Sequence, residues 1–370
     1  MKKRKSILNW IITVITFTAV AIMAIKTDFS QFRPAMSDLN YLWLCLALVI
    51  VIMSWLSDAL IIKNILPGIT GKKVSILKSI KYSIVGLYYM ALTPFGSAGQ
   101  PMQMVYMAND GIPIGKTTAA ASIKFFTDKI AVCFIFNVFL IISGDAFYKS
   151  NNGIFWFSII AFAMNLLILM GVFLLIRKPA FAGRVFKGSI RFLAKLKIVK
   201  NPQKTETKID AAIKDYSLAA QFILGNKTQT FILSLLSILR RMLLIAVPYL
   251  LYRAFGFSMY GMIEIMALNV FMSLAITLMP TPGSSLAAEG GFSAIYISIF
   301  GVAIIPAVVI WRLLTYYLVI IVGSTMIIGN KILKMVYRPS AETPKLVFQR
   351  RDETQLQEDH LRSDILKQLT

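Results

Sequence analysis

The chain has 370 residues, of which 57% are hydrophobic, and its formal net charge is +22 at pH 7. Several apolar runs reach the ~20 residues that a helix needs to cross ~30 Å of hydrocarbon, which excludes an ordinary soluble protein. The two cysteines lie in apolar runs and the single histidine, His360, lies in a charged tail. The composition therefore excludes disulfide frameworks, zinc sites and histidine-based triads. We expect an all-α polytopic membrane protein with no catalytic residues, no metal and no cofactor.

Six apolar runs are long enough to span a membrane. The first follows the basic residues "MKKRK", but it is long and has no small-residue cleavage site after it, so we expect a retained helix. The six predicted spans are 7–25, 41–62, 117–143, 153–176, 228–252 and 304–328.

The positive charge is distributed unevenly between the predicted loops. Segments 1–5, 63–116, 177–227 and 331–370 carry 4, 6, 12 and 8 of the 39 lysines and arginines. Basic residues mark cytoplasmic segments of membrane proteins. Both termini are therefore expected in the cytoplasm, and the positive charge faces anionic lipids of the cytoplasmic leaflet. No nucleic-acid partner is needed to explain it.

Two apolar stretches, 83–108 and 261–300, fit no simple span. The first is cut by "LTPFGSAGQPMQ" and the second by "MPTPGSSLAAEGG". The arms beside the breaks have roughly 9 to 18 residues, and at ~1.5 Å per residue many of them cross only part of the hydrocarbon. We expect two re-entrant hairpins that enter from opposite faces, giving eight apolar segments in all. The alternative is that both stretches are proline-kinked spans, giving eight crossings.

The order span, hairpin, span occurs twice, in 41–143 and again in 228–328, with opposite orientation. An inverted repeat whose broken helices meet near the midplane is typical of transporters. Residues 1–330 would form this transmembrane domain, and 331–370 a cytoplasmic tail. The basic connection 177–227 joins the halves. It is predicted to be either an interfacial helix on the anionic leaflet or a solvated linker.

Charged residues within the spans are the first candidates for function, because each costs ~2.5–3.5 kcal/mol to insert. Lys124 and Asp128 are four residues apart and share a helix face. Arg240 and Arg241 lie near the middle of their span, and Arg312 lies in the last span.

Adjacent helical residues point in different directions. We therefore expect one of Arg240 and Arg241 to face a cavity and the other to pair with Asp128 or Glu289. Asp58 lies close to the cytoplasmic end of its span, where we expect its carboxylate to snorkel to the surface.

The two breaks supply the other half of the predicted site. Pro94 and Pro282 end helices, and Gly96, Gly99 and Gly283 permit tight backbone conformations. Helix N-termini at such breaks carry partial positive charge and N–H groups that suit a phosphate. With the arginines they would form an anion-attracting cavity at membrane depth, and a lipid phosphate headgroup is the expected ligand. Another anion or a proton-coupled solute is the alternative.

Four motifs carry a resemblance to a known family. "TPFGSAGQPMQMVYM", "IKFF", "PTPGSSLAAEGGF" and "WRLLTYY" resemble, in this order, the flippase-like membrane region of the lysylphosphatidylglycerol synthase (multiple peptide resistance factor) family, particularly its Gram-positive branch. The similarity extends from about 41 to 329. Leu286 departs from the pattern, which has Gly at that position. The family's first break is matched by Thr93, Pro94, Phe95, Gly99, Gln100, Pro101 and Gln103, and its second by Pro280, Thr281, Pro282, Gly283 and Glu289.

The resemblance has functional implications. In complete members the membrane region precedes a soluble domain that transfers lysine from lysyl-tRNA to phosphatidylglycerol. The membrane region moves the product to the outer leaflet and confers resistance to cationic peptides. Because the resemblance covers the membrane region without the soluble domain, it implies a translocator of an anionic or aminoacylated phospholipid, such as lysylphosphatidylglycerol, in a bacterial plasma membrane.

The alternative is an enzymatic role, as the membrane subunit of a phosphatidylglycerol lysyltransferase that works with a separate soluble synthase. A second copy of the chain is a further candidate partner. We expect the lipid pathway to include Thr93, Pro94, Gly96, Gly99, Gln100, Gln103, Lys124, Asp128, Arg240, Arg241, Pro282, Gly283, Glu289 and Arg312.

Overall fold

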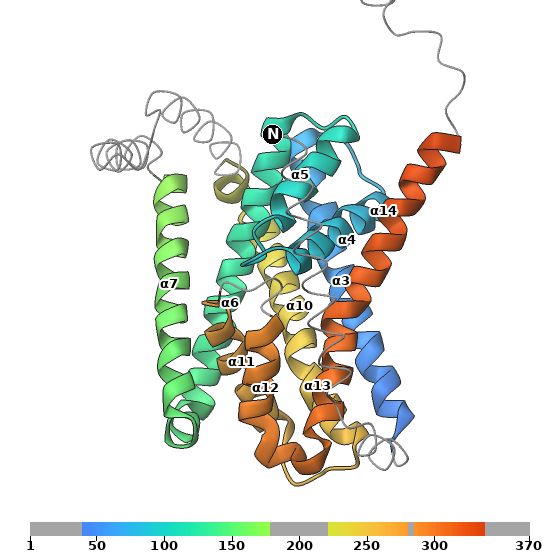
Figure 1. Cartoon of the computed structure of the whole chain (residues 1–370). Coiled ribbons are helices and arrows are strands. Elements are labelled where there is room, and N and C mark those ends of the chain that lie inside the picture. Colours follow the sequence, from blue (N-terminus) through green and yellow to red (C-terminus); the bar gives the residue numbers. More distant parts are fainter. Residues whose placement is uncertain (1–38, 178–220, 280–284, 337–370) are drawn as a thin grey trace, which may run out of the picture. The chain divides into compact units, whose positions relative to one another are not determined.

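A computed structural model describes residues 39–177, 221–279 and 285–336 (Figure 1). Within these ranges the chain forms helices and no β-strand, as predicted. The predicted span 7–25, most of the connection 177–227, the tail from 337 onward, and Pro282 with Gly283 lie outside the described residues.

Five helical stretches are long and apolar enough to cross a membrane, judged by length and composition. They are Tyr41–Thr70, Ile114–Ser150, Asn152–Leu174, Lys227–Ala254 and Ala287–Gly329. Each of them contains or largely covers one of the predicted spans that begin at 41, 117, 153, 228 and 304. The chain is thus a multi-pass membrane protein, and the part of it that the structure describes is all-helical. Its long helices are α3 (Tyr41–Thr70), α6 (Ile114–Ser150), α7 (Asn152–Arg177) and α10 (Lys227–Ala254).

The last stretch is interrupted. A 3-10 turn, η1 (Gly301–Ala303), separates α12 (Ser285–Phe300) from α13 (Ile304–Arg312), and Gly301 has a φ of 53° there. A short π-helical segment, η2 (Leu313–Tyr317), follows α13 and leads into α14 (Leu318–Val336).

The chain divides into two compact units, Met1–Ser324 and Thr325–Thr370. Of the second unit the structure describes only the last part of α14. Every contact described below lies within the first unit.

Three long helices form the centre of the first unit. α10 packs along α3 and against α6, while α7 packs on α6 and on α11 (Met262–Ile276). The pair α4 (Ile76–Leu92) and α5 (Gly99–Asn109) packs on α3 and α6, and α12 packs on α11 and α13. In Figure 1, α4 and α5 lie toward one end of the bundle and α11 and α12 toward the other.

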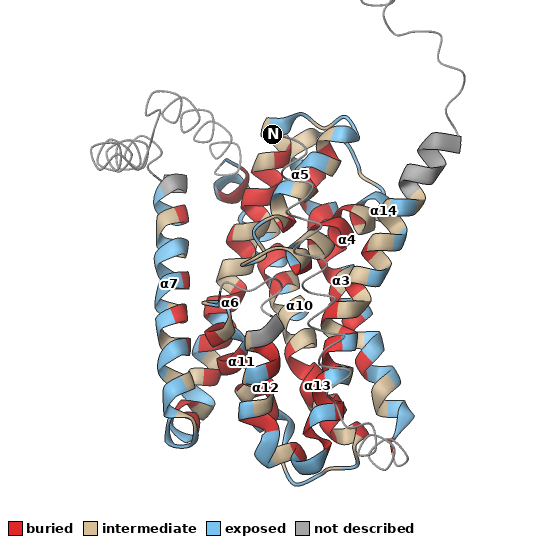
Figure 2. Ribbon diagram, viewed as in Figure 1, coloured by how far each residue is buried: buried red, intermediate tan, exposed pale blue. Residues whose placement is uncertain are grey.

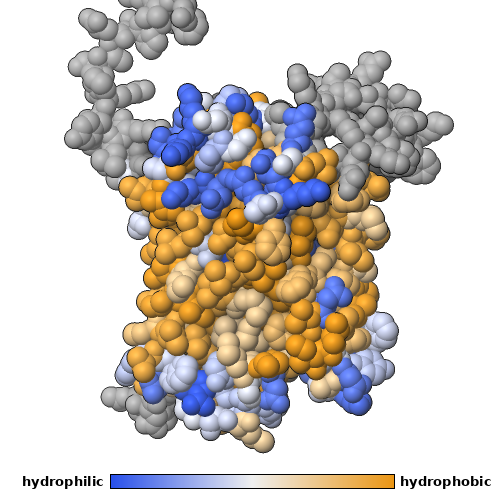
Figure 3. Space-filling view, turned by 180° about the vertical axis from the view of Figure 1, so that it is seen from behind, coloured by the Kyte–Doolittle hydropathy of each residue, from blue (hydrophilic) through white to orange (hydrophobic). Residues whose placement is uncertain are grey.

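The buried residues of these helices face one another in the bundle (Figure 2). One large core cluster includes Phe136, Phe271 and Phe292, and a second includes Ile61 and Ile123. The outer surface is an apolar band between two polar ends (Figure 3), as expected for a protein embedded in lipid.

The first break occupies residues 93–98, between α4 and α5, inside the stretch that was predicted to be interrupted. Phe95 and Gly96 both have positive φ values, 55° and 64°, which turn the chain sharply. Thr93 closes the turn, because its hydroxyl accepts a hydrogen bond from the Ala98 amide at 3.1 Å and donates one to the Tyr89 carbonyl at 2.7 Å.

A close backbone crossing holds α4 and α5 together. A Cβ added at Gly99 would lie 2.8 Å from the carbonyl oxygen of Gly86, so glycine is required there. Gln103 is buried and donates a hydrogen bond to the Tyr82 carbonyl at 3.0 Å. These contacts fix the second arm of the break against the first.

The second break lies between α11 and α12. α11 ends at Ile276 and α12 begins at Ser285, so this stretch is also interrupted where its sequence predicted. The structure describes residues 277–279 of the break.

Candidate functional site

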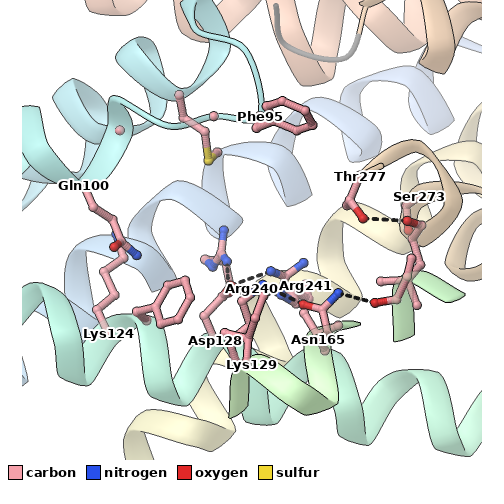
Figure 4. A pocket seen from close by; sticks show the side chains of 18 of the residues that line it. Phe95, Gln100, Lys124, Asp128, Lys129, Asn165, Arg240, Arg241, Ser273 and Thr277 are labelled. Carbon is pink, nitrogen blue, oxygen red and sulfur yellow. Dashed lines mark hydrogen bonds and ion pairs between the residues drawn. The ribbon is translucent and has the colours of Figure 1, made fainter. Parts of the chain in front are cut away.

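A cavity of about 670 Å³ opens among α3, α6, α7, α10, α11 and the first break (Figure 4). Part of its lining is apolar, contributed by α4, α6, α7, α10 and α11. Its charged lining consists of Asp58, Lys124, Asp128, Lys129, Arg240 and Arg241. The first break contributes Phe95, Gly96 and Ser97, and the first turn of α5 contributes Gly99, Gln100 and Pro101.

Asp58 and Lys124 form the first ion pair of this cluster, with Nζ 2.7 Å from Oδ2. The Ser83 hydroxyl donates a second hydrogen bond to the same carboxylate oxygen at 2.7 Å. The prediction that Asp58 snorkels is therefore wrong, because its side chain is only 2% exposed. Cations from α6 and α10 compensate its charge inside the bundle, which removes the need to reach water.

Asp128 binds both adjacent arginines. Arg241 approaches it with two nitrogens, Nε at 3.0 Å from Oδ1 and Nη2 at 2.5 Å from Oδ2, and Arg240 binds Oδ1. Arg240 Nε also lies 3.6 Å from Oδ1 of Asp58, so it bridges the two carboxylates. We expected one arginine to face a cavity and the other to pair with Asp128 or Glu289; in the structure both line the cavity and both bind Asp128. Arginine side chains are long enough for two of them, leaving the helix in different directions, to converge on one carboxylate.

Two polar residues at the cavity were not among the predicted site residues. Lys129 on α6 donates a hydrogen bond from Nζ to Oδ1 of Asn165 on α7 at 2.6 Å. Asn165 is an isolated amide in a long apolar run, and such a residue in a membrane span is a sequence signal for a candidate site residue. Lys129 follows Asp128 directly in the sequence. Helical spacing relates Asp128 to Lys124, four residues earlier, and so did not single out Lys129.

A second charged pair lies apart from the main cavity. Arg312 Nε is 3.5 Å from Oε1 of Glu289, and both side chains are 7% exposed. The guanidinium carbon of Arg312 also lies 4.9 Å from the ring centroid of Trp311 and 5.2 Å from that of Tyr316. Glu289 thus neutralises Arg312 rather than either of the arginines on α10.

A smaller cavity of about 330 Å³ extends toward this second pair, and its lining includes Arg312 and Thr315. The two cavities meet at a shared boundary. The residues that line both are Leu87, Met90, Phe95, Gly96, Arg240 and Thr277. Phe95 comes from the first break and Thr277 from the second, and Figure 4 shows both on the side of the main cavity opposite Asp128.

The predicted residues of the first break play different parts. Gly96, Gly99 and Gln100 line the main cavity, where the N-terminal turn of α5 begins. Gln103 also lines it, although its amide is hydrogen-bonded to α4. Thr93 and Pro94 shape the turn without lining either cavity.

The main cavity is thus lined by more cations than carboxylates, and among the described residues no cluster of three His, Cys, Asp or Glu side chains occurs that could hold a metal ion. A comparison with curated proteins gave no match. A family model described as "Lysylphosphatidylglycerol synthase TM region" matches residues 9–323 of the chain.

Proposed function

Because the chain belongs to the family of lysylphosphatidylglycerol synthase transmembrane regions, we propose that it is a flippase-like translocator of phospholipid headgroups. The observation that carries the proposal is the charged cavity beside Asp128 and Arg241, which lies inside a bundle with an apolar outer surface. A charged cavity at membrane depth is costly to keep, and it marks a pathway for a polar group.

In the proposed mechanism a headgroup enters the main cavity while its acyl chains stay in the lipid. The cations of α6 and α10 replace the water that the headgroup loses. The headgroup then passes the boundary formed by Phe95 and Thr277 into the smaller cavity. The pairs α4–α5 and α11–α12 act as re-entrant hairpins that open alternately, as broken helices do in inverted-repeat transporters.

The orientation we propose follows from the basic loops. Lys72, Lys73 and Lys78 are exposed at the end of the bundle where α3 ends and α4 begins. This end would face the anionic cytoplasmic leaflet of a bacterial plasma membrane, with both termini on the same side. The cargo would be an anionic or aminoacylated phospholipid such as lysylphosphatidylglycerol. A second copy of the chain, in a homo-oligomer, is a further candidate partner.

Lipid movement in proteoliposomes tests the function. The purified chain is reconstituted with a fluorescent phosphatidylglycerol, and the outer-leaflet label is quenched with an impermeant reductant over time. We expect a protein-dependent rate that Arg241→Gln lowers at least ~10-fold, and a control variant, Lys149→Gln, should keep the full rate. A rate no higher than that of empty liposomes would overturn the proposal.

A second function is favoured by the description of the matched family as a region of a synthase. The chain would then be the membrane subunit of a phosphatidylglycerol lysyltransferase and would bind a separate soluble synthase. Purification from the native membrane in mild detergent tests this. Lysine transfer from lysyl-tRNA to phosphatidylglycerol by the purified material would support it, and a preparation that binds no synthase would overturn it.

A further inference from the structure

We propose that the main cavity seats the phosphate of a net-negative lipid headgroup between Lys129 and Arg241, and that it disfavours a headgroup carrying an added lysyl cation. The inference rests on the proposed function and narrows its cargo from anionic or aminoacylated phospholipids to the anionic ones.

The charges on the cavity wall do not balance. Four cations line it, namely Lys124, Lys129, Arg240 and Arg241, against the two carboxylates of Asp58 and Asp128. Each of these carboxylates already binds two of the cations. An uncompensated positive charge in a protein interior is costly, and an anion in the cavity would lower that cost.

The excess charge lies on the side of the cavity that faces α7. Lys129 donates to the neutral oxygen of Asn165, which uses one of the three donors of its ammonium group. Its Nζ also lies 5.2 Å from the ring centroid of Phe125. Arg241 is the most exposed cation of the ion-pair cluster, at 33% against 15% for Lys124 and 12% for Arg240. Lys129 and Arg241 are therefore the cations best placed to receive a ligand.

The rest of the cavity wall suits a lipid better than a free ion. Met164 and Ile168 of α7 and Val270 and Leu274 of α11 line the same space. A volume of about 670 Å³ with convergent polar groups and apolar walls is typical of sites that enclose an organic ligand. Inorganic phosphate would leave these apolar walls without a partner, whereas the glycerol and the upper acyl chains of a phospholipid would cover them.

The same charges disfavour a lysylated headgroup. A lysyl ester adds two ammonium groups to one phosphate, so that the headgroup becomes a net cation. Like charges repel strongly where the dielectric constant is low. Among the described residues no other carboxylate lines the main cavity, and two of those outside it, Glu289 and Asp110, already bind Arg312 and Lys81.

Binding measurements on the purified full chain test the inference. Dissociation constants are compared for four probes: dioctanoyl phosphatidylglycerol, its lysyl ester, dioctanoyl phosphatidylcholine and inorganic phosphate. We expect phosphatidylglycerol to bind at least ~10-fold more tightly than each of the others. Lys129→Gln should weaken phosphatidylglycerol binding ~10-fold, since it removes a charge-assisted hydrogen bond, and Lys129→Arg should restore most of the affinity. The exposed residue Lys73 supplies the matched control, Lys73→Gln, which should bind like the wild type.

Three results would overturn the inference. The lysyl ester could bind as tightly as phosphatidylglycerol. Lys129→Gln could elute as a folded, monodisperse protein with unchanged affinity. Inorganic phosphate could bind as tightly as the lipid, which would identify a soluble anion as the ligand. Lipid movement in the same preparation separates the two proposals: movement without the binding preference overturns only this inference, and the binding preference without movement overturns only translocation.

Discussion

The ammonium group of Lys124 lies 2.7 Å from the carboxylate of Asp58, and this pair joins α6 to α3 inside the bundle. The Asp58 side chain is 2% exposed and that of Lys124 is 15% exposed. Removing one partner of a buried pair leaves an uncompensated charge, whereas removing both leaves none. The pair therefore fixes how the two helices meet and makes each partner depend on the other.

We expect Asp58→Asn to lower the free energy of unfolding by ~3–5 kcal/mol, because it leaves Lys124 without a carboxylate partner. The double variant Asp58→Asn, Lys124→Met should recover much of that loss. Denaturant unfolding in detergent measures both. As a control, Lys149→Gln breaks an exposed pair with Asp145 and should cost no more than ~1 kcal/mol. A double variant as unstable as Asp58→Asn alone would contradict the expected coupling.

Substitutions at Asp128 and at Arg241 should affect the stability of the protein and its lipid transport differently. Arg241→Gln leaves Arg240 on Asp128, so we expect a small loss of stability and a large loss of lipid movement. Asp128→Asn removes the carboxylate that both arginines share, and we expect it to destabilise the protein by ~3–5 kcal/mol. Unfolding and proteoliposome assays on the two variants check this. Equal destabilisation by both would mean that Arg241 serves only the structure.

Apolar run lengths were sufficient to predict the long helices, because a lipid-embedded helix must be apolar over most of its length. The breaks were also predictable, because each motif combines two prolines with two or more glycines within about a dozen residues, whereas the isolated prolines Pro67 and Pro248 lie inside helices. The turn at Gly301 between α12 and α13 also lies where the sequence placed the boundary between the stretch 261–300 and the span that begins at 304.

The site was only partly predictable. Position in a span identified Lys124, Asp128, Arg240 and Arg241 as cavity residues. It left open which arginine pairs with Asp128 and did not predict the Asp58–Lys124 pair, because pairing depends on how three helices pack and on where long side chains converge. Asp58 was misjudged for this reason.

Gly99 should tolerate no side chain. Its substitution by Ala would place a Cβ 2.8 Å from the Gly86 carbonyl oxygen, a backbone atom that cannot move without separating α4 from α5. We expect a loss of ~1–3 kcal/mol in unfolding free energy. The control is Gly171→Ala in α7, where an added Cβ would meet no atom within 4 Å beyond its own stretch of helix, and this variant should be neutral or slightly stabilising. Similar stabilities for the two variants would argue against the close crossing.

Asp110 should make the stability of the α4–α5 pair depend on pH. Burial would raise the pKa of Asp110, but hydrogen bonds from Lys81 and Tyr82 outweigh it and hold the pKa below the ordinary value. A lowered pKa contributes stability above the unfolded-state pKa of ~3.9, and this contribution is lost as the pH falls through the folded-state pKa. The stability difference between wild type and Asp110→Asn should thus be constant from pH 7 to 5 and shrink below pH 4. Unfolding curves across that range measure it, and a difference that does not shrink as the pH falls below 4 would contradict the assignment.

Phe95 combines a strained backbone with a place on the boundary between the cavities. Its φ of 55° is costly for any residue with a Cβ, and the residue is 61% exposed. We expect Phe95→Gly to be more stable than Phe95→Ala by ~1 kcal/mol, because only glycine relieves the strain. Both variants remove the ring that lines the two cavities, so both should move lipid faster than the wild type. Thermal unfolding and proteoliposome rates check the two effects independently. An Ala variant more stable than the Gly variant would contradict the strained turn, and unchanged rates in both would remove Phe95 from the pathway.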